Sequence, residues 1–385
     1  MPKFITKEDK HKITDKTEMA NQFNTFFINI GKKLAESLPL TDESAYEKYL
    51  LTKTNTQFKF SVVTEENIDK IIRNLKLHTS TGIDKISSAF IKSFSYILSK
   101  PLTYLINLSL TNGVFPDSLK IAKVLPIFKG NNLDINSLNN YRPISVLPIL
   151  SKIFERAVYN QIYDYFTSNN LLYISQYGFR RNHSTELAVT EFVDNVFKFL
   201  DNGINPIAIF MDLSKAFDTI NHPTILYKLR HYGISDNELN WFQSYLSNRK
   251  QLVCLDDYTS SLSTITTGVP QGSILGPLLF LIYVNDLSSS STNTKCIMYA
   301  DDTSLLIPYK LNSCCTIATQ TDFINNELKY VYDWLCANKL SLNTNKTKYM
   351  IFHFTQRKLS NNDIPSIKIH EKQIERVETF KFLGN

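Results

Sequence analysis

Apolar side chains recur at intervals of three or four residues through long parts of the chain, a spacing that predicts α-helices. The first such pattern, over residues 15–37, includes Phe23, Phe27, Ile30 and Leu34. Further helices are predicted over 64–75, 88–110, 151–169, 184–200, 275–284 and 323–336. In the helix that follows Ser184, the predicted apolar face consists of Val189, Phe192, Val193, Val196, Phe197 and Leu200.

Two more helices are predicted after Asp218, and the second has Ser235 and Glu238 at capping-box spacing. Short apolar runs predict strands over 122–129, 207–211, 252–255, 263–266 and 349–354. The run at 207–211 is unbroken, which is typical of a strand covered on both faces near the middle of a sheet.

Residues 297–306 contain two apolar runs separated by the adjacent acids Asp301 and Asp302. This pattern predicts a hairpin with the acidic pair at or beside its turn. Because aspartate is favoured in turns, a solvated turn without chemistry is one interpretation. The alternative depends on Asp212, which closes the strand at 207–211. Two strands that each supply a carboxylate could hold a pair of divalent cations for phosphoryl transfer. Asp212 and Asp301 would bridge two magnesium ions, with Asp302 as a further ligand or supporting charge.

The composition indicates an ordered globular protein of two or three domains or subdomains. The chain has 385 residues, 43% hydrophobic content, 11 Gly and 13 Pro. Its five cysteines include no Cys-x-x-Cys pair, so they predict neither a zinc site nor a disulfide framework, and a reducing, intracellular setting fits best. The N-terminus has no apolar core of a signal peptide, and no apolar run is long enough to predict a membrane span.

The positive charge of the chain is concentrated in one stretch. The net charge is +6, and residues 120–181 contain eight basic and three acidic residues, a local +5. A basic stretch of this kind suits a phosphate-bearing partner, although a solvated surface of mixed charge is an equal alternative.

Two further features could meet a nucleotide. Lys129 and Arg142, on neighbouring predicted strands, could grip a triphosphate, Arg as a planar fork and Lys as a point charge. The Gly-Val-Pro-Gln-Gly loop at 268–272 would let backbone approach a flat ligand, with Gln271 as a hydrogen-bonding group. Surface charges and a tight packing turn are the plain alternatives.

Taken in order, these motifs resemble the reverse transcriptase domain of non-LTR, LINE-like retrotransposons of the jockey and CR1 type. The resemblance covers roughly residues 60 to 385, and the helix around Phe23 to Phe27 is similar to the segment that precedes this domain. The motifs are Leu125–Lys129, Asn140–Ser145, Gln176–Arg180, Met211–Asp218, Gly268–Ser273, Tyr299–Asp302 and Phe382–Gly384.

The resemblance implies an α+β fold of the right-hand polymerase type, with fingers and an antiparallel palm sheet packed on helices. The implied parts are an N-terminal helical extension and linker (1–60), fingers (61–150 and 222–272) and palm (151–221 and 273–385). The thumb is expected to be largely absent, and missing endonuclease and thumb regions would come from a longer polyprotein. The nucleus is the compartment expected for such elements.

The resemblance also implies roles for single residues. Asp212, Asp301, Asp302 and the Leu213 carbonyl would hold two Mg²⁺ ions, for which Mn²⁺ could substitute. Lys346 or, second, Lys348 would protonate the departing pyrophosphate. The nucleotide-binding residues would be Lys129, Arg142, Gln271, Tyr299 and Phe217, the last of which would exclude a 2′-hydroxyl.

The implied activity is RNA-templated DNA synthesis, with an RNA template, a DNA primer or RNA–DNA hybrid, and dNTPs as partners. An RNA-dependent RNA polymerase is a near alternative, opposed by the bulky ring of Phe217. A catalytically inactive remnant that binds nucleic acid is an alternative from another class, which the intact acids oppose. A metal nuclease is a third and weaker alternative, because a nuclease would need neither a sugar-excluding ring nor a Lys and Arg pair for a triphosphate.

Overall fold

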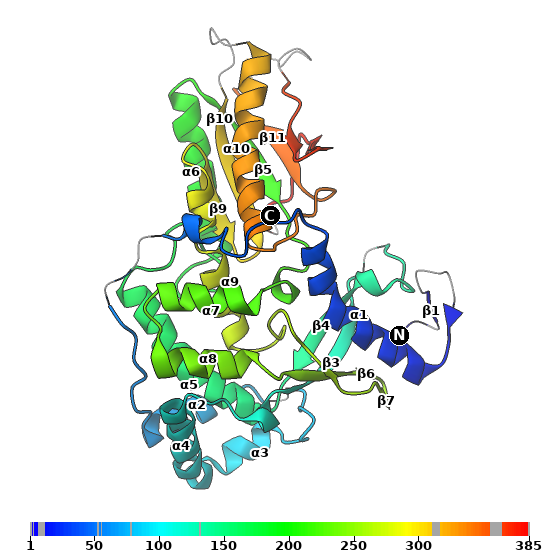
Figure 1. Cartoon of the computed structure of the whole chain (residues 1–385), viewed down its shortest axis with the longest axis vertical. Helices are drawn as coiled ribbons and strands as arrows, with labels where there is room; N and C mark the ends of the chain where they lie inside the picture. The colour runs from blue at the N-terminus through cyan, green and yellow to red at the C-terminus, as the bar shows by residue number, and fades with distance from the viewer. Residues whose placement is uncertain are drawn as a thin grey trace. The chain divides into compact units, whose positions relative to one another are not determined.

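The computed structural model describes residues 2, 4–6, 12–51, 54, 56–77, 79–130, 132–309, 316–354 and 364–383. Gly384, in the last motif of the resemblance, lies outside these residues. The chain forms two compact units, coloured along the chain in Figure 1. The first unit comprises 1–33, 53–171 and 217–279, and the second comprises 34–52, 172–216 and 280–385.

The second unit is built on a sheet whose middle strand is β5 (Asn205–Met211). The strand order is β14-β11-β5-β10-β9, and all pairs are antiparallel except β11 with β14. All seven residues of β5 are buried, which confirms the predicted central strand. The other strands are β9 (Lys295–Tyr299), β10 (Asp302–Tyr309), β11 (Lys348–Ile351) and β14 (Glu375–Arg376).

Helix α6 (Thr185–Asp201) packs on one face of this sheet (Figure 1). Phe192, Val196 and Leu200 form a core with residues of β5, β9 and β10. The predicted apolar face was too wide, because Val193 and Phe197 are 42% and 55% exposed. The buried residues of α6 recur at steps of four, so only a narrow stripe meets the sheet.

The remaining elements of the second unit are helical or short. Helix α10 (Ile317–Ala337) begins six residues before its predicted start, since Thr316 caps it by accepting a hydrogen bond from the Thr319 amide. The polar residues of its first turns gave no apolar periodicity. The short elements are η1 (Glu47–Tyr49), η5 (Leu287–Ser290), β12 (Lys368–Ile369) and β13 (Lys372–Gln373).

The first unit contains a second sheet, in the order β4-β3-β6-β7, with β8 paired to β6. Strand β3 is antiparallel to β4 and parallel to β6. Helix α1 (Lys16–Glu36) covers one face of this sheet, where Phe23 packs against Tyr141. The strands are β3 (Ile121–Phe128), β4 (Tyr141–Val146), β6 (Lys250–Leu255), β7 (Tyr258–Thr259) and β8 (Ser263–Thr264). A separate two-stranded sheet joins β1 (Ile5–Thr6) and β2 (Lys12–Ile13).

The single helix predicted over 88–110 is in fact two helices, since the backbone leaves helical geometry at Phe94 (φ −109°, ψ 20°). The predicted start at Thr64 is confirmed by a complete capping box with Asn67. The helices are α2 (Glu65–Arg73), α3 (Ser88–Ser93), α4 (Ser95–Asn112), α5 (Ile149–Ser168), α7 (His222–His231), α8 (Asp236–Leu246) and, continuing into the second unit, α9 (Leu275–Val284). Short 3₁₀ helices are η2 (Asp117–Leu119), η3 (Leu138–Asn140) and η4 (Ala216–Asp218).

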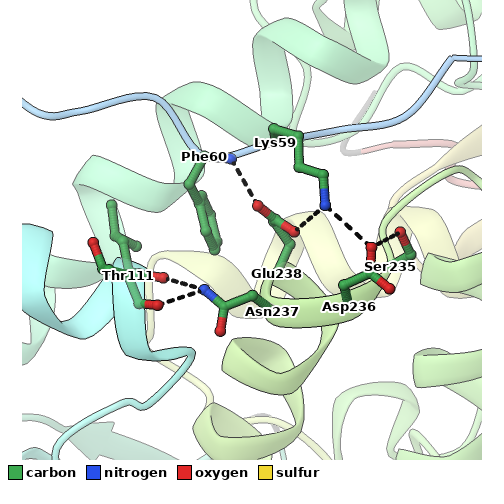
Figure 2. A network of polar contacts seen from close by, with 8 residues as sticks. Lys59, Phe60, Thr111, Ser235, Asp236, Asn237 and Glu238 are labelled. Atoms are coloured by element: carbon green, nitrogen blue, oxygen red, sulfur yellow. Dashed lines mark hydrogen bonds and ion pairs between the residues drawn. The ribbon is translucent and has the colours of Figure 1, made fainter.

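The capping box predicted at the start of α8 is wrong. Ser235 makes no side-chain cap, and Glu238 instead accepts a hydrogen bond from the Phe60 amide at 3.2 Å (Figure 2). Lys59 bridges the carboxylates of Glu238 and Asp236 at 3.1 and 3.2 Å. These acids therefore fasten the segment that precedes α2 onto α8, a contact distant in sequence that local spacing does not reveal.

In the described part of the chain, no helix combines the length and the apolar character that crossing a bilayer requires.

Candidate active site

The predicted acidic hairpin is present in the second unit. Tyr299 of β9 pairs with Asp302 of β10, so Ala300 and Asp301 form a two-residue turn. Ala300 has a φ of 57°, a left-handed conformation that two-residue hairpin turns require and that glycine adopts most easily. The acidic pair therefore stands at the tip of the hairpin, as its sequence pattern predicts.

Asp212 lies beside this hairpin. Met211 of β5 pairs with Thr303 of β10, so Asp212 and Asp302 follow at the next position on two neighbouring strands. Such strands are about 4.8 Å apart. Because side chains alternate across a strand, both acids leave the sheet on the face that includes Phe210. Carboxylates separated by about ninety positions in the sequence therefore converge.

A lysine approaches the same acids from the other neighbouring strand. Strand β11 pairs with β5 with Lys348 opposite Phe210. Lys346 precedes this strand, and its Nζ lies 3.6 Å from Asp212 Oδ2. Lys348 instead pairs with Glu375 at 2.5 Å. Of the two lysines predicted as candidates, Lys346 is the one directed at the acids.

Leu213 forms an antiparallel bridge with Leu342 directly after β5. Two hydrogen bonds join these segments, from the Asn343 amide to the Asp212 carbonyl and from the Ser214 amide to the Ser341 carbonyl, both at 2.8 Å. Neither bond uses the carbonyl of Leu213. This geometry is compatible with that carbonyl as a ligand.

The acids repel one another. Partial burial raises the pKa of Asp302 to about 6, and the charges of Asp301 and Asp212 add to the rise, while Lys346 opposes it. Asp302 nevertheless keeps a solvent-exposed surface. Of the two causes of its raised pKa, the repulsion by Asp301 and Asp212 is therefore the one that bears on cation binding. Cations bound among these carboxylates would relieve the repulsion between them.

The residue types suit a divalent cation, although the side chains are not gathered around one point. Within the residues that the structure describes, no three His, Cys, Asp or Glu side chains form a ready metal site. Carboxylate and carbonyl oxygens are the ligands that Mg²⁺ prefers. Rotation about side-chain torsions, without movement of the strands, can turn Asp212 and Asp302 toward each other.

A cavity of about 680 Å³ opens in front of these acids. Asp212, Asp302, Lys346 and the half-buried Tyr299 line it together with an apolar wall. In that wall Phe380 stacks on Phe210, with ring centroids 4.1 Å apart and planes 8° apart. The cavity therefore joins a charged floor to a flat aromatic side.

In the first unit, the Pro-Gln-Gly loop packs against the segment that contains Phe217. The Val269 amide donates to the Phe217 carbonyl at 2.9 Å. Gln271 Nε2 donates to both carboxylate oxygens of Asp218, at 2.8 and 3.0 Å. Because a carboxylate only accepts hydrogen bonds, this contact fixes the amide orientation and leaves the Gln271 oxygen to meet a ligand.

Two glycines permit this close packing. Gly268 has a φ of 80°, and a Cβ there would lie 2.8 Å from backbone atoms of Phe217 and Asp218. Gly272 has a φ of 130°, and its Cβ would lie 2.4 Å from the Ser145 carbonyl of β4. The loop therefore adheres to β4 and to the Phe217 segment through backbone that only glycine allows.

Lys129 and Arg142 lie on one face of the β3–β4 pair. Arg142 is opposite Ile127, two residues before Lys129, so the two cations share a face on which Ile127 is 49% exposed. Lys129 Nζ also donates to the Asn139 carbonyl at 2.9 Å. The structure thus unites Phe217 with Gln271 and Lys129 with Arg142 in the first unit, and the predicted metal and acid–base residues in the second.

The charge of the basic stretch is less available than its sequence suggests. Lys120 is 2% exposed and pairs with Asp117 at 2.7 Å. Arg180 donates to the carbonyls of Tyr173 and Gln176 at 3.0 and 3.1 Å. Only part of the local +5 can therefore meet a phosphate backbone.

Sequence reasoning missed Glu155, a fully buried carboxylate of α5. Its Oε2 accepts hydrogen bonds from the Ile274 and Leu275 amides at 2.6 and 3.1 Å, at the start of the helix that follows the loop. Burial raises the pKa of Glu155, while Arg249 and these amides oppose the rise. Glu155 lies three residues before the apolar Val158, and this helical spacing could have indicated that Glu155 is buried. Gln176, which the sequence placed only within the motif Gln176–Arg180, was also missed as a single site residue.

Comparison with known proteins identifies the family. A family model described as reverse transcriptase (RNA-dependent DNA polymerase) matches residues 128–385, more than half of the chain. The chain belongs to this family. The resemblance drawn from the ordered motifs and the α+β fold class are thereby confirmed. Reverse transcriptase domains are generally dependent on divalent metal ions.

Similar proteins come from mobile elements of flies. The chain is 28% identical to the RNA-directed DNA polymerase from mobile element jockey of Drosophila melanogaster over 345 residues, which is 88% of this chain and 36% of that protein. It is 29% identical to the probable RNA-directed DNA polymerase from transposon BS of the same species, over 95% of this chain and 39% of that protein. The chain therefore spans well under half of the length of these reverse transcriptase relatives.

Proposed function

We propose that this reverse transcriptase catalyses RNA-templated DNA synthesis for retrotransposition, by transfer of a nucleotide from a dNTP to a primer 3′-hydroxyl. The observation that supports this most is the pairing of β5 with β10, because it brings Asp212 beside Asp302 at the end of one sheet. In a member of this family, acids converging next to a lysine fit phosphoryl transfer better than they fit a solvated turn.

In this proposal, Asp212, Asp301 and Asp302 hold two Mg²⁺ ions together with the carbonyl of Leu213, and Mn²⁺ can substitute. Such ions, when bound, stabilise the charge on the attacking and leaving oxygens. The repulsion that raises the pKa of Asp302 supports this assignment, since cations would relieve it.

Lys346 serves as the general acid toward the departing pyrophosphate. Its Nζ is 3.6 Å from Asp212, within reach of any group held by that carboxylate, and its side chain is 66% exposed and free to reorient. Tyr299 borders the same cavity and contacts the incoming nucleotide.

Four residues of the first unit bind and select the nucleotide. Lys129 and Arg142 bind its phosphates, Phe217 excludes a 2′-hydroxyl, and Gln271 offers its amide oxygen. The support is the shared face of Lys129 and Arg142 and the attachment of Gln271 to Asp218, the neighbour of Phe217.

The proposed polymerase parts are fingers over 61–150 and 222–272 and palm over 151–221 and 273–385. Residues 1–60 form an N-terminal extension. The template is RNA, and the primer is DNA or an RNA–DNA hybrid. The greater length of the relatives is consistent with endonuclease and thumb regions in a longer polyprotein. Synthesis takes place in the nucleus.

Primer extension by the purified chain tests the proposal, with an RNA template, a DNA primer, dNTPs and Mg²⁺. Asp212→Ala should lower the rate by at least about 10³-fold, as expected for a group on which the chemical step depends. The matched control is Asp194→Ala, which removes an exposed acid that pairs with Lys198 on α6 and should leave the rate unchanged.

Absence of extension by the wild-type chain, with retained RNA binding, would instead support a non-catalytic nucleic-acid-binding protein. The exposed face with Lys129 and Arg142 is the feature that favours this second candidate.

A further inference from the structure

Gln176 lies directly against the strand that leads into the acidic turn. The Tyr177 amide donates to the Met298 carbonyl at 2.8 Å, and the Met298 amide donates to the Ser175 carbonyl at 2.9 Å. Residues 175–177 therefore extend the edge of the sheet beside β9. Gln176 itself is 2% exposed, so its side chain is enclosed by protein.

The side-chain oxygen of Gln176 holds the turn. Oε1 accepts a hydrogen bond from the Ala300 amide at 3.0 Å and a second from the Gly178 amide at 2.9 Å. In a two-residue hairpin, the amide of the first turn residue is not used by the pairing between the strands. Gln176 supplies the acceptor that the hairpin lacks at this position.

The turn is also conformationally demanding. Ala300 has a φ of 57°, in a region that alanine enters only at a cost in free energy. A Cβ on Gly178 would lie 2.1 Å from the Ala300 nitrogen, so these two backbones pack without room for a side chain. The Gln176 oxygen accepts hydrogen bonds from both of these backbone segments.

The nitrogen of the Gln176 side-chain amide indicates why a glutamine occupies this position. Among the described residues, Gln176 Nε2 is buried without a hydrogen-bond partner. An unpaired buried donor destabilises the fold, whereas an apolar side chain of similar length would avoid this cost. The amide is therefore better explained by what its oxygen does than by space filling.

We infer that Gln176 is a positioning residue for the catalytic acids, because its amide oxygen fixes the Ala300 backbone from which Asp301 and Asp302 extend. The inference rests on the proposed function and deepens it, because Gln176 would act on the acids through the Ala300 backbone. Small displacements of a reacting group reduce rates strongly. Loss of the oxygen should thus alter metal binding and the chemical step more than nucleotide binding.

Three variants separate this role from a general contribution to folding. Gln176→Met keeps the length of the side chain and removes the acceptor. Gln176→Glu keeps an acceptor oxygen, and burial favours its neutral form. The matched control is Gln161→Met, since Gln161 also makes two backbone hydrogen bonds, with the Ser61 amide at 2.7 Å and the Ser61 carbonyl at 3.1 Å.

The measurements are thermal unfolding, Mn²⁺ affinity by electron paramagnetic resonance, and single-turnover primer extension at varied dNTP. For Gln176→Met we expect a loss on the order of 100-fold in the maximal rate. Its Mn²⁺ affinity should fall about tenfold, as for other groups that support metal ligands. The dNTP concentration for half-maximal rate should change less than about threefold. Gln176→Glu should recover most of both losses, and Gln161→Met should show neither.

Unchanged Mn²⁺ affinity and rate in Gln176→Met would overturn the inference, and so would equal losses in Gln161→Met. If Gln176→Met does not fold, Gln176→Glu decides, because loss of Mn²⁺ affinity in a variant that retains the acceptor contradicts the role of the oxygen. If the wild-type chain extends no primer, the proposed function fails. The Mn²⁺ comparison then tests the inference alone.

Discussion

The acidic hairpin and the Pro-Gln-Gly loop are both tight turns, but their charges are arranged in opposite ways. In the loop, one carboxylate, Asp218, receives two hydrogen bonds from Gln271. In the hairpin region, the charges of Asp301 and Asp212 contribute to the raised pKa of Asp302, and Lys346, which pairs with Asp212, opposes the rise. The carboxylate of the loop is held by hydrogen bonds, whereas the carboxylates of the hairpin region repel one another, a repulsion that bound cations would relieve.

The two turns also obtain their shapes differently. In the loop, Gly268 and Gly272 adopt conformations suited to glycine. In the hairpin, the left-handed position is filled by Ala300 and is stabilised by Gln176 from another segment. The loop should therefore act through shape and the hairpin through charge, and each of the following predictions tests this distinction.

Among the tests of this contrast, the largest effect is expected for sugar selection when the ring of Phe217 is removed. Phe217→Ala should raise ribonucleotide incorporation relative to deoxynucleotide incorporation on the order of 100-fold, the scale on which one group in a pocket discriminates. Competition between rNTP and dNTP in primer extension measures it. The Mn²⁺ affinity should not change, since Phe217 acts by shape. The control is Phe197→Ala, an exposed ring on α6. Unaltered sugar selection would contradict the role of Phe217.

The same contrast explains how much the sequence could predict. The hairpin, the central strand and their acids were predictable, because apolar alternation and an unbroken apolar run are local signals. The hypothesis from the sequence paired Asp212 with Asp301 and gave Asp302 a supporting part, and the register of Met211 with Thr303 sets Asp302 next to Asp212. The metal, phosphate and sugar-selecting roles themselves stay predictions.

Contacts between distant segments were not predictable in the same way. Gln176 and Ala300 are 124 positions apart, and Glu155 meets the Ile274 amide across 119 positions. Each is a polar side chain whose partner is a backbone amide, and a backbone amide has no sequence signature. The failed capping box at Ser235 has the same cause, because Glu238 was taken by Lys59 and Phe60.

A smaller effect should appear when one carboxylate is neutralised in each region. Asp218→Asn removes the charged acceptor of Gln271 and should lower the free energy of unfolding by about 1 kcal/mol, the scale of a partly exposed hydrogen bond. The dNTP concentration for half-maximal rate should also rise, since the amide orientation is no longer fixed. Asp302→Asn removes repulsion and should raise stability at pH 8 without metal. Chemical denaturation in EDTA measures the two changes in the free energy of unfolding. If both variants change stability in the same direction, the contrast between loop and hairpin is refuted.

The smallest effect concerns pH. The pKa of Asp302 is raised to about 6 from an ordinary value near 3.8, so between these values the folded chain retains a proton that the unfolded chain releases. Without metal, stability should therefore decline as the pH rises from 4 to 6 and stay lower above it. Mn²⁺ affinity should show the opposite trend and fall as the pH drops through 6, because the ligand must be ionised. The difference between wild type and Asp302→Asn isolates this group from other acids. If both proteins show the same pH slopes in stability and in Mn²⁺ affinity, Asp302 is not coupled to the neighbouring carboxylates. The electrostatic difference between the hairpin and the loop would then be refuted.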